Sequence, residues 1–302
     1  MKIAILNECF FKEQHLNTLR ALGDVVIYKN TNNEEEAIKR LKGVDIAIAA
    51  YYTTPLNKKV LESTDALKLL VVNSTGYDGV DTIVAKNRGI LVANTPGYAT
   101  EAVAEHAVAL MLAISKKILT RDATMRQSPF KINPANQKHK KYLGFNLQGK
   151  TLGIVGLGSI GLRVAQIGMS FGMKVLAYNR SKKNIEGVRQ TSLEGLLKES
   201  DIVSLHVPLT TETNNLITKE RLQMMKSTAI FINTARGEIV DELALINALW
   251  SHRIAGAGLD TIVGWKKSNP LLKMDNVVLS PHSAFFTNES LNNCADIIVE
   301  TA

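Results

Sequence analysis

The sequence predicts an α/β protein of two domains, each built on a doubly wound parallel β-sheet with helices on both faces. Short apolar runs alternate with helical stretches, the alternation forms two separate series, and Asn94-Thr-Pro-Gly97 breaks the chain between them. Such alternation is typical of parallel sheets, because a helix usually returns the chain between two parallel strands. A chain of 302 residues is long enough for two domains with cores of their own.

The first series predicts a domain of residues 1–98. Its expected strands are residues 2–6, 25–28, 45–50, 69–72 and 90–93. After the break, we expect Thr100 to cap one long helix over residues 101–125, which links the two domains.

The second series predicts a domain of residues 99–284. Its expected strands are residues 152–155, 175–178, 202–206, 229–233, 256–259 and 277–279. A helix over residues 290–300 would return the chain, so that residues 285–302 complete the first domain. Ligands of open parallel sheets bind beyond the carboxyl ends of the strands, so we expect a cleft between the domains.

The formal net charge of +8 does not indicate a nucleic-acid partner. The basic residues are scattered, and their one tight cluster, Lys138-His-Lys-Lys141, has no aromatic residues between its members. No membrane association is expected either, because Glu105 and His106 interrupt the most apolar helical segment, and the apolar run before Asn7 is too short for a signal peptide.

The two cysteines, Cys9 and Cys294, give neither a disulfide framework nor a metal-ligand spacing. We expect both to be buried as small apolar side chains in a cytoplasmic protein. No metal site is predicted.

A glycine motif follows the first strand of the second series. Gly156, Gly158 and Gly161 form Gly-x-Gly-x-x-Gly between an apolar strand and a helical pattern that begins at Ser159 and Ile160. The first glycine permits a tight turn, the second lets a pyrophosphate approach the backbone, and the third lets the helix pack closely on the strand. In this context the motif predicts a dinucleotide site at the helix N-terminus.

The carboxylate that usually follows such a motif is absent. At the end of the next strand, where an Asp or Glu binds the ribose hydroxyls of NAD, this chain has Asn179, Arg180 and Ser181. The missing carboxylate removes repulsion of a 2′-phosphate, and Arg180 offers a planar cation for it. We therefore expect NADP to be the preferred cofactor, with NAD possible.

Further chemistry-bearing residues follow later strands. Arg236 could bind a carboxylate with its guanidinium fork, or it could form a salt bridge between the domains. His282 is the natural proton carrier among the histidines. His206 is expected to shape the cofactor pocket, whereas His15, His106, His139 and His252 are expected to be core or surface residues.

Taken in order along the chain, these motifs resemble those of the D-isomer-specific 2-hydroxyacid dehydrogenase family. The resemblance covers nearly the whole length. It rests on Ser74-Thr-Gly-Tyr-Asp-Gly-Val-Asp81, Asn94-Thr-Pro-Gly97, the glycine motif, His206-Val-Pro-Leu209, Asn233-Thr-Ala-Arg-Gly237, Gly258-Leu-Asp260 and Pro281-His282. It implies two Rossmann-like or flavodoxin-like domains, of which residues 99–284 form the dinucleotide-binding Rossmann domain, and a homodimer.

The resemblance also implies roles for single residues. Arg236 would bind the substrate and polarise its carbonyl, His282 would be the general acid and base, and Asp260 would contact the nicotinamide side. The backbone at Ser74, Thr75 and Gly76 would hold the substrate carboxylate, with Tyr51, Tyr52 and Tyr77 near the substrate side chain. Further cofactor contacts would come from Val207, Pro208, Thr234, Ala235 and Ser283.

One position departs from the family pattern. The family usually has a glutamate five residues after the Asp260 position, where it pairs with the histidine, but this chain has Trp265, and no carboxylate occurs over residues 261–274. Without an anionic partner, the pKa of His282 should be lower than in a paired relative. Another group could orient His282, the histidine could act alone in a slower enzyme, or catalysis could be lost. Trp265 could either pack in its loop or contact the substrate.

The sequence therefore predicts an NAD(P)-dependent oxidoreductase that interconverts a small 2-keto acid and its D-2-hydroxy acid. The alternative is a dinucleotide-sensing, corepressor-like binding protein with weak or no turnover. Trp265 favours this alternative, whereas Arg236 and His282 favour the enzyme.

Overall fold

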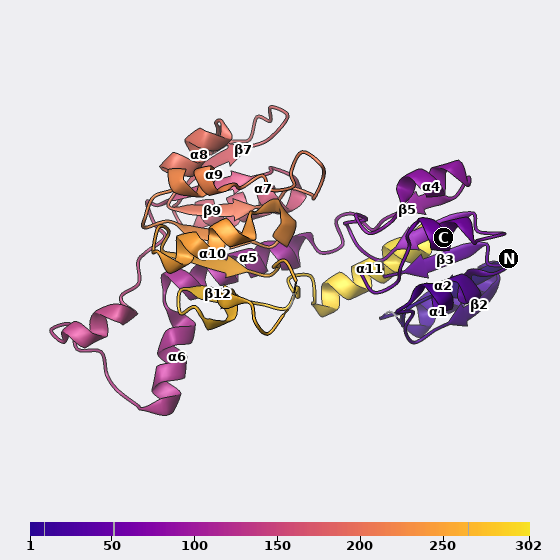
Figure 1. Cartoon of the computed structure of the whole chain (residues 1–302), viewed down its shortest axis with the longest axis horizontal. Helices are drawn as coiled ribbons and strands as arrows, with labels where there is room; N and C mark the ends of the chain where they lie inside the picture. Colours follow the sequence, from indigo (N-terminus) through magenta and orange to yellow (C-terminus); the bar gives the residue numbers. More distant parts are fainter. Residues whose placement is uncertain (9, 51, 265) are drawn as a thin grey trace. The chain divides into compact units, whose positions relative to one another are not determined.

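The chain forms two compact α/β units. The computed structural model describes residues 1–8, 10–50, 52–264 and 266–302, so the sequence-based expectations for Cys9, Tyr51 and Trp265 lie outside the described residues. Unit 1 consists of Met1–Ala99 and Phe285–Ala302, and unit 2 consists of Thr100–Ala284. Each has its own parallel sheet (Figure 1).

Unit 1 is a five-stranded sheet with the strand order β2-β1-β3-β4-β5, which is the flavodoxin-like order. Its strands are β1 (Lys2–Ile5), β2 (Asp24–Ile27), β3 (Ile46–Ala49), β4 (Leu69–Val72) and β5 (Leu91–Ala93). Its helices are α1 (Glu13–Leu22), α2 (Glu34–Leu41), α3 (Lys58–Glu62), α4 (Thr82–Asn87) and α11 (Asn288–Thr301). The last of these helices packs against α1, so the end of the chain completes the unit.

Unit 2 is a seven-stranded sheet with the order β12-β11-β10-β9-β6-β7-β8. Its strands are β6 (Thr151–Val155), β7 (Lys174–Tyr178), β8 (Val188–Gln190), β9 (Ile202–Leu205), β10 (Ile230–Asn233), β11 (Gly256–Leu259) and β12 (Val277–Leu279). Its α-helices are α5 (Thr100–Ser115), α6 (Ile118–Gln127), α7 (Ser159–Ser170), α8 (Leu193–Glu199), α9 (Lys219–Met224) and α10 (Glu242–Trp250). Short 3-10 helices are η1 (Gln137–Tyr142), η2 (Gly237–Ile239) and η3 (Pro270–Lys273).

Two apolar cores cover the two faces of the sheet of unit 2. Successive strand side chains point to opposite faces, so Phe231 belongs to one core whereas Ile230 and Ile232 belong to the other. Helices α8, α9 and α10 contribute to the core around Phe231, and α5 and α7 contribute to the opposite core. Burial on both faces explains why the strand sequences are almost continuously apolar.

Side-chain caps fix the beginnings of several helices. The side chains of Ser192, Thr218 and Asp241 each accept a hydrogen bond from the backbone amide of the third residue of α8, α9 and α10. These caps satisfy amide groups that have no partner inside the helix, so each helix begins at a defined residue.

The fold class predicted from the sequence is confirmed, but two elements differ. The expectation of one helix over residues 101–125 is wrong, because Lys117 adopts φ 55° and separates α5 from α6. The sequence reading also missed β8, which pairs with β7 at the edge of the sheet.

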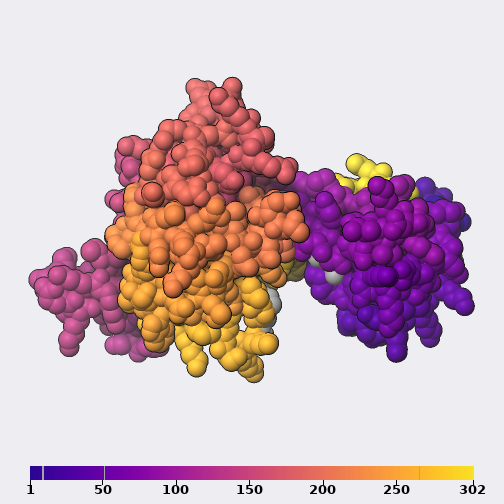
Figure 2. Space-filling model, turned by 45° about the horizontal axis from the view of Figure 1, so that its top comes forward, coloured from indigo at the N-terminus to yellow at the C-terminus, as the bar shows by residue number. Residues whose placement is uncertain are grey.

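Residues 118–142, from α6 through η1, form a segment that we call the arm. Figure 2 shows it in magenta, protruding from the remainder of unit 2. None of the residues of α6, all of which the structure describes, is buried. Its exposed apolar side chains are those of Ile118, Leu119 and Met125.

No helix within the described ranges has both the length and the apolar character required to cross a membrane.

Candidate functional site

The glycine loop of unit 2 joins β6 to α7. Gly156 adopts φ +96°, a conformation that side-chain-bearing residues rarely adopt, and its amide donates to the Tyr178 carbonyl at 2.9 Å. A Cβ atom on Gly161 would lie 2.0 Å from the Gly156 carbonyl oxygen, so the first turn of α7 packs directly on the loop. Both glycines are therefore required by the geometry of the protein itself.

Gly158 has a different environment. It is the N-cap of α7, and a Cβ built on it would meet no atom of the protein within 4 Å. The open side of the loop therefore lies where Ser159 and Ile160 begin the helix, and helix N-termini attract phosphate groups. The Oγ1 atom of Thr234 is also buried without a hydrogen-bond partner among the described residues, as expected where a ligand supplies one. The residues present fit a dinucleotide.

Asn179 braces the glycine loop at the end of β7. Its side-chain oxygen accepts from the Leu157 amide at 3.0 Å, and its amide group donates to the Ser181 carbonyl at 2.8 Å. The Lys183 ammonium donates to the Leu157 carbonyl at 2.8 Å. Arg180 is exposed beside this bracing. The sequence reading did not identify Lys183, although the run of basic residues after Asn179 was a signal.

His206 follows β9 and lies against the glycine loop. Its carbonyl oxygen and the Val207 side chain are the atoms that a Cβ on Gly156 would strike, at 2.6 and 2.7 Å. The Ser204 hydroxyl lies 2.8 Å from Nε2, and burial lowers the pKa of His206 to about 3. His206 is therefore a neutral ring. Pro208 follows and is exposed.

The turn after β10 carries Arg236. Asn233 fixes this turn, since its side-chain oxygen accepts from the Ala235 amide at 3.0 Å and its amide group donates to the Arg236 carbonyl at 2.8 Å. Arg236 is half-buried, and Nη1 donates to the Ala235 carbonyl at 2.8 Å. A fixed turn of this kind presents a guanidinium at the carboxyl edge of the sheet.

The ends of β11 and β12 are joined through Asp260. Its fully buried carboxylate accepts from the Ser280 hydroxyl at 2.6 Å and from the amides of Ser283 at 2.9 Å and Ala284 at 3.0 Å. The His282 amide donates to the Asp260 carbonyl at 2.9 Å, and His282 itself has φ 53°. The carboxylate thus binds the backbone that carries His282, a role that the sequence did not suggest.

His106 joins this group from helix α5. Its Nε2 atom lies 2.7 Å from the Ser280 Oγ and 3.6 Å from Asp260 Oδ1. The sequence reading treated His106 as a core or surface residue, because nothing in the spacing of residues 106, 260 and 280 indicates this contact.

In unit 1, the loop after β4 presents backbone amides. The Ser74 hydroxyl donates to the Gly76 carbonyl at 2.6 Å, and the Asn94 side chain donates to the Thr75 carbonyl at 2.7 Å, so the loop is held in place. Within the described part of the chain, the amides of Thr75 and Gly76 have no protein acceptor. Two adjacent amide donors in a fixed loop suit a carboxylate.

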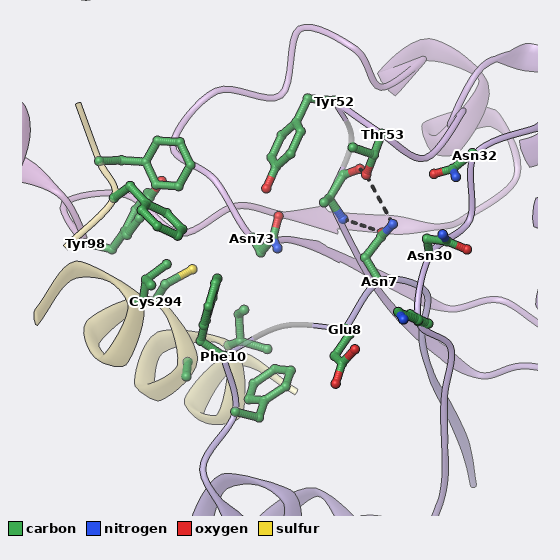
Figure 3. A pocket seen from close by; sticks show the side chains of 18 residues that line it. Asn7, Glu8, Phe10, Asn30, Asn32, Tyr52, Thr53, Asn73, Tyr98 and Cys294 are labelled. Carbon is green, nitrogen blue, oxygen red and sulfur yellow. Dashed lines mark hydrogen bonds between the residues drawn. The ribbon is translucent and has the colours of Figure 1, made fainter. Parts of the chain in front are cut away.

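A pocket of about 260 Å³ lies in unit 1 at the carboxyl ends of its strands (Figure 3). Its polar side is formed by residues that follow β1, β2, β3 and β4, and its apolar side by aromatic rings and one face of α11. The lining includes Asn7, Glu8, Phe10, Asn30, Asn32, Tyr52, Thr53, Asn73, Tyr98, Phe285 and Cys294. Tyr52 thus belongs to this pocket, whereas Tyr77 lines a separate hollow beside β5.

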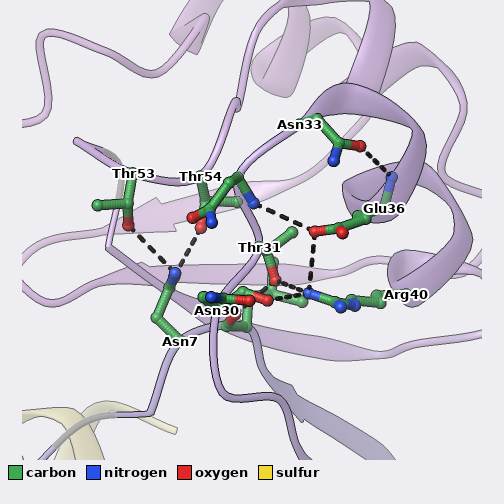
Figure 4. Close-up of polar contacts among 10 residues, drawn as sticks. Asn7, Asn30, Thr31, Asn33, Glu36, Arg40, Thr53 and Thr54 are labelled. Carbon is green, nitrogen blue, oxygen red and sulfur yellow. Dashed lines mark hydrogen bonds and ion pairs between the residues drawn. The ribbon is translucent and has the colours of Figure 1, made fainter.

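Hydrogen bonds shape the polar side of the pocket (Figure 4). Asn7 accepts from the Thr54 hydroxyl at 2.6 Å and donates to the Thr53 hydroxyl at 3.1 Å. Nearby, Arg40 Nη1 donates to the Thr31 hydroxyl at 2.7 Å, and Thr31 donates to the Leu6 carbonyl at 2.5 Å. These bonds connect the ends of β1 and β3 to α2.

The described residues contain no group of three or more His, Cys, Asp or Glu side chains placed to hold a metal ion.

The glycine loop and the strand-end residues of unit 2 define a dinucleotide-dependent oxidoreductase. The model of the D-isomer specific 2-hydroxyacid dehydrogenase NAD binding domain matches residues 108–284. The chain belongs to the D-isomer-specific 2-hydroxyacid dehydrogenase family, and it is an NAD(P)-dependent enzyme of that class. Nothing in the comparisons supports the alternative of a corepressor-like sensor.

Relatives of known name cover most of the chain. Glyoxylate reductase of Thermococcus litoralis is 41% identical over 268 residues, which cover 87% of this chain and 81% of the relative. The structure of an acyclic imino acid reductase in complex with NADPH and D-Arg has a TM-score of 0.93 and 38% identity, covering 99% of this chain and 95% of its own. The structure of D-lactate dehydrogenase of Aquifex aeolicus, solved with NAD and lactic acid, has a TM-score of 0.88 and 33% identity. The match covers 100% of this chain and 94% of the dehydrogenase.

The glycine loop gives a matched pair of predictions. Gly158→Ala should fold as well as the wild type, because its Cβ meets no protein atom, but it should bind NADPH and NADH more weakly, because the methyl group occupies the approach of the pyrophosphate. Gly161→Ala should lower the free energy of unfolding by about 1–3 kcal/mol, because its Cβ would strike the Gly156 carbonyl. Thermal unfolding and fluorescence titration measure the two effects, and normal cofactor affinity in Gly158→Ala would contradict the proposed path of the pyrophosphate.

The lowered pKa of His206 gives an acid-stability prediction. Between about pH 6.5 and pH 3, the unfolded chain binds a proton at this ring that the folded protein does not bind, so the free energy of unfolding falls as the pH falls through this range. Urea unfolding of His206→Gln at several pH values should show a shallower decline than the wild type. Equal slopes in the variant and the wild type would refute the prediction.

Proposed function

We propose that the enzyme reduces a small 2-keto acid to the D-2-hydroxy acid, with NADPH preferred and NADH as a possible alternative. The observation that carries this proposal is the arrangement of neighbouring strands in unit 2. Strands β10, β11 and β12 are adjacent and parallel, and their carboxyl ends carry Arg236, Asp260 and His282. The glycine loop follows β6 at the same edge.

The roles of the residues follow from their chemistry. When bound, the nicotinamide cofactor supplies the hydride to the keto carbon. Arg236 binds the substrate carboxylate with its planar fork and polarises the carbonyl. His282 donates a proton to the oxygen as it becomes an alkoxide and takes it back in the reverse reaction. The amides of Thr75 and Gly76 bind the substrate carboxylate in unit 1.

The proposed NADPH preference rests on the end of β7. The Asn179 side chain is engaged by the glycine loop, and no carboxylate occupies its position. Arg180 is exposed there, and Lys182 and Lys183 follow it, so the segment is strongly basic. A 2′-phosphate would find several cations and no repelling group.

Arg180→Ala tests the cofactor preference. This variant should weaken NADPH binding by about 1–3 kcal/mol and leave NADH binding nearly unchanged, because only NADPH carries the 2′-phosphate. Arg189→Ala, which removes the same charge from β8, is the matched control and should not discriminate between the two cofactors. If Arg180→Ala weakens the binding of NADPH and NADH equally, Arg180 does not bind the 2′-phosphate.

A second candidate substrate is a 2-imino acid, which would give a D-amino acid. The likeness to the acyclic imino acid reductase that binds NADPH and D-Arg favours it. The pocket of unit 1 favours it too, since about 260 Å³ is more room than glyoxylate uses, and Glu8 offers a carboxylate to a cationic side chain. We propose that this pocket, in the substrate-binding domain of residues 1–98 and 285–302, receives the substrate side chain.

A substrate screen tests both candidates. Purified enzyme with NADPH is assayed with glyoxylate, pyruvate, hydroxypyruvate and 2-keto acids with longer side chains, with and without ammonium ions, and the products are separated by chiral chromatography. A D-2-hydroxy acid, or glycolate from the achiral reduction of glyoxylate, formed without ammonium supports the first candidate. A D-amino acid formed only with ammonium supports the second. L-products would contradict both.

Arg236→Lys gives an independent check of the same site. The variant keeps the charge but loses the fork, so kcat/KM for the best substrate should fall roughly 100- to 1000-fold. The affinity for NADPH should stay close to the wild-type value. Near-normal turnover in Arg236→Lys would show that the guanidinium fork of Arg236 is not needed for substrate binding.

We also propose a cytoplasmic homodimer. The arm exposes Ile118, Leu119 and Met125 along a helix with no buried residue, and such a helix gains stability when its apolar side chains are covered by a second copy. The buried thiol of Cys294 and reduction by NADPH both suit a reducing compartment.

A further inference from the structure

A continuous chain of hydrogen bonds lies beneath the turn that carries His282. It begins at His106 on α5, passes through the Ser280 hydroxyl after β12, and ends at the Asp260 carboxylate after β11. The distances are 2.7 Å from His106 Nε2 to Ser280 Oγ and 2.6 Å from Ser280 Oγ to Asp260 Oδ1. All of these residues lie in unit 2.

The direction of each hydrogen bond in this series follows from which groups can donate and which can accept. A carboxylate only accepts, so the single hydroxyl proton of Ser280 points to Asp260. The Ser280 oxygen must then accept from His106, which places a proton on Nε2 of that ring. The Asp260 side chain has a relative exposure of 0% and the His106 side chain one of 26%, so the contact is largely shielded from water. Hydrogen bonds in such surroundings are strengthened.

The carboxylate at the end of this chain controls backbone on both sides of His282. Its oxygens accept the Ser280 hydroxyl before the histidine and the amides of Ser283 and Ala284 after it. His282 itself lies at φ 53°, a left-handed conformation that residues with a side chain rarely adopt. Such a conformation persists only where the surroundings fix it.

We propose that His106 is a positioning residue for His282, acting through Ser280 and Asp260. The His106 N–H orients the Ser280 hydroxyl, the hydroxyl orients the Asp260 carboxylate, and the carboxylate holds the left-handed turn from which the imidazole projects. The inference rests on the proposed role of His282 as the proton donor. It adds two residues, His106 and Ser280, that do not touch the reacting atoms but decide where the proton donor lies.

A positioning role and a merely structural role predict different kinetics. Loss of the donor at residue 106 should lower kcat on the order of 10- to 100-fold, as small displacements of a reacting group do, with KM and NADPH affinity close to the wild-type values. A structural contact between α5 and the sheet would instead lower thermal stability and leave the kcat of the folded enzyme unchanged.

The experiment compares a donor-free with a donor-keeping variant at each position. His106→Leu fills similar space without an N–H group, whereas His106→Gln can place an amide N–H close to the position of Nε2. Ser280→Ala removes the hydroxyl, and Ser280→Thr keeps it. We expect His106→Leu and Ser280→Ala to lose kcat, the Gln and Thr variants to recover most of it, and the double variant His106→Leu/Ser280→Ala to be no slower than the slower single variant.

Two control variants distinguish an error in the assignment of His282 from an error in the positioning role of His106. His139→Leu, in the arm, should leave kcat unchanged. His282→Ala tests the underlying role: if it keeps substantial turnover, the assignment of His282 as proton donor fails, whatever the His106 variants do. If His282→Ala is inactive while His106→Leu keeps the wild-type kcat, or if the Gln variant is as slow as the Leu variant, the positioning role of His106 is overturned.

Discussion

The parallel direction of the strands is the constraint on which the site depends. In unit 2, every strand pairs in parallel with its neighbours, so each carboxyl end arrives at one edge of the sheet. Residues that follow different strands meet there, although nothing in their own sequences favours the contact. The glycine loop, the neutral ring of His206 and the turn of Arg236 lie where they do because strand pairing places them there.

The sequence predicts the fold class because strands that are buried on both faces have nearly continuous apolar sequences. Where a strand lacks such an apolar run, the sequence does not predict it. The edge strand β8 has three residues, Val188–Gln190, of which none is buried, so it lacks the apolar run of the central strands. The division between α5 and α6 depends on one backbone angle at Lys117, which helical periodicity does not encode.

The candidate site shows the same division. The glycine motif could be read from sequence because its three glycines lie close together between a strand and a helix. Gly156 and Gly161 meet local steric demands of the protein, whereas Gly158 leaves the side of the loop open. The contact between His106 and Ser280 joins residues 174 positions apart, and the binding of the Leu157 amide by Asn179 joins residues 22 apart, so neither follows from local spacing. The role of Trp265 stays a prediction, since this residue lies outside the described part of the chain.

The two segments of unit 1 have a consequence for the order of folding. Helix α11 supplies the buried side chains of Cys294, Ala295 and Ile298 to a unit whose sheet is made by Met1–Ala99. On the ribosome, that sheet must wait for α11 until all of unit 2 has been synthesised, whereas Thr100–Ala284 is one continuous segment that can fold as it emerges. Until α11 has been synthesised, the side chains of unit 1 that pack against it, among them those of α1, stay exposed, so unit 1 is open to aggregation and to chaperones for longer than unit 2.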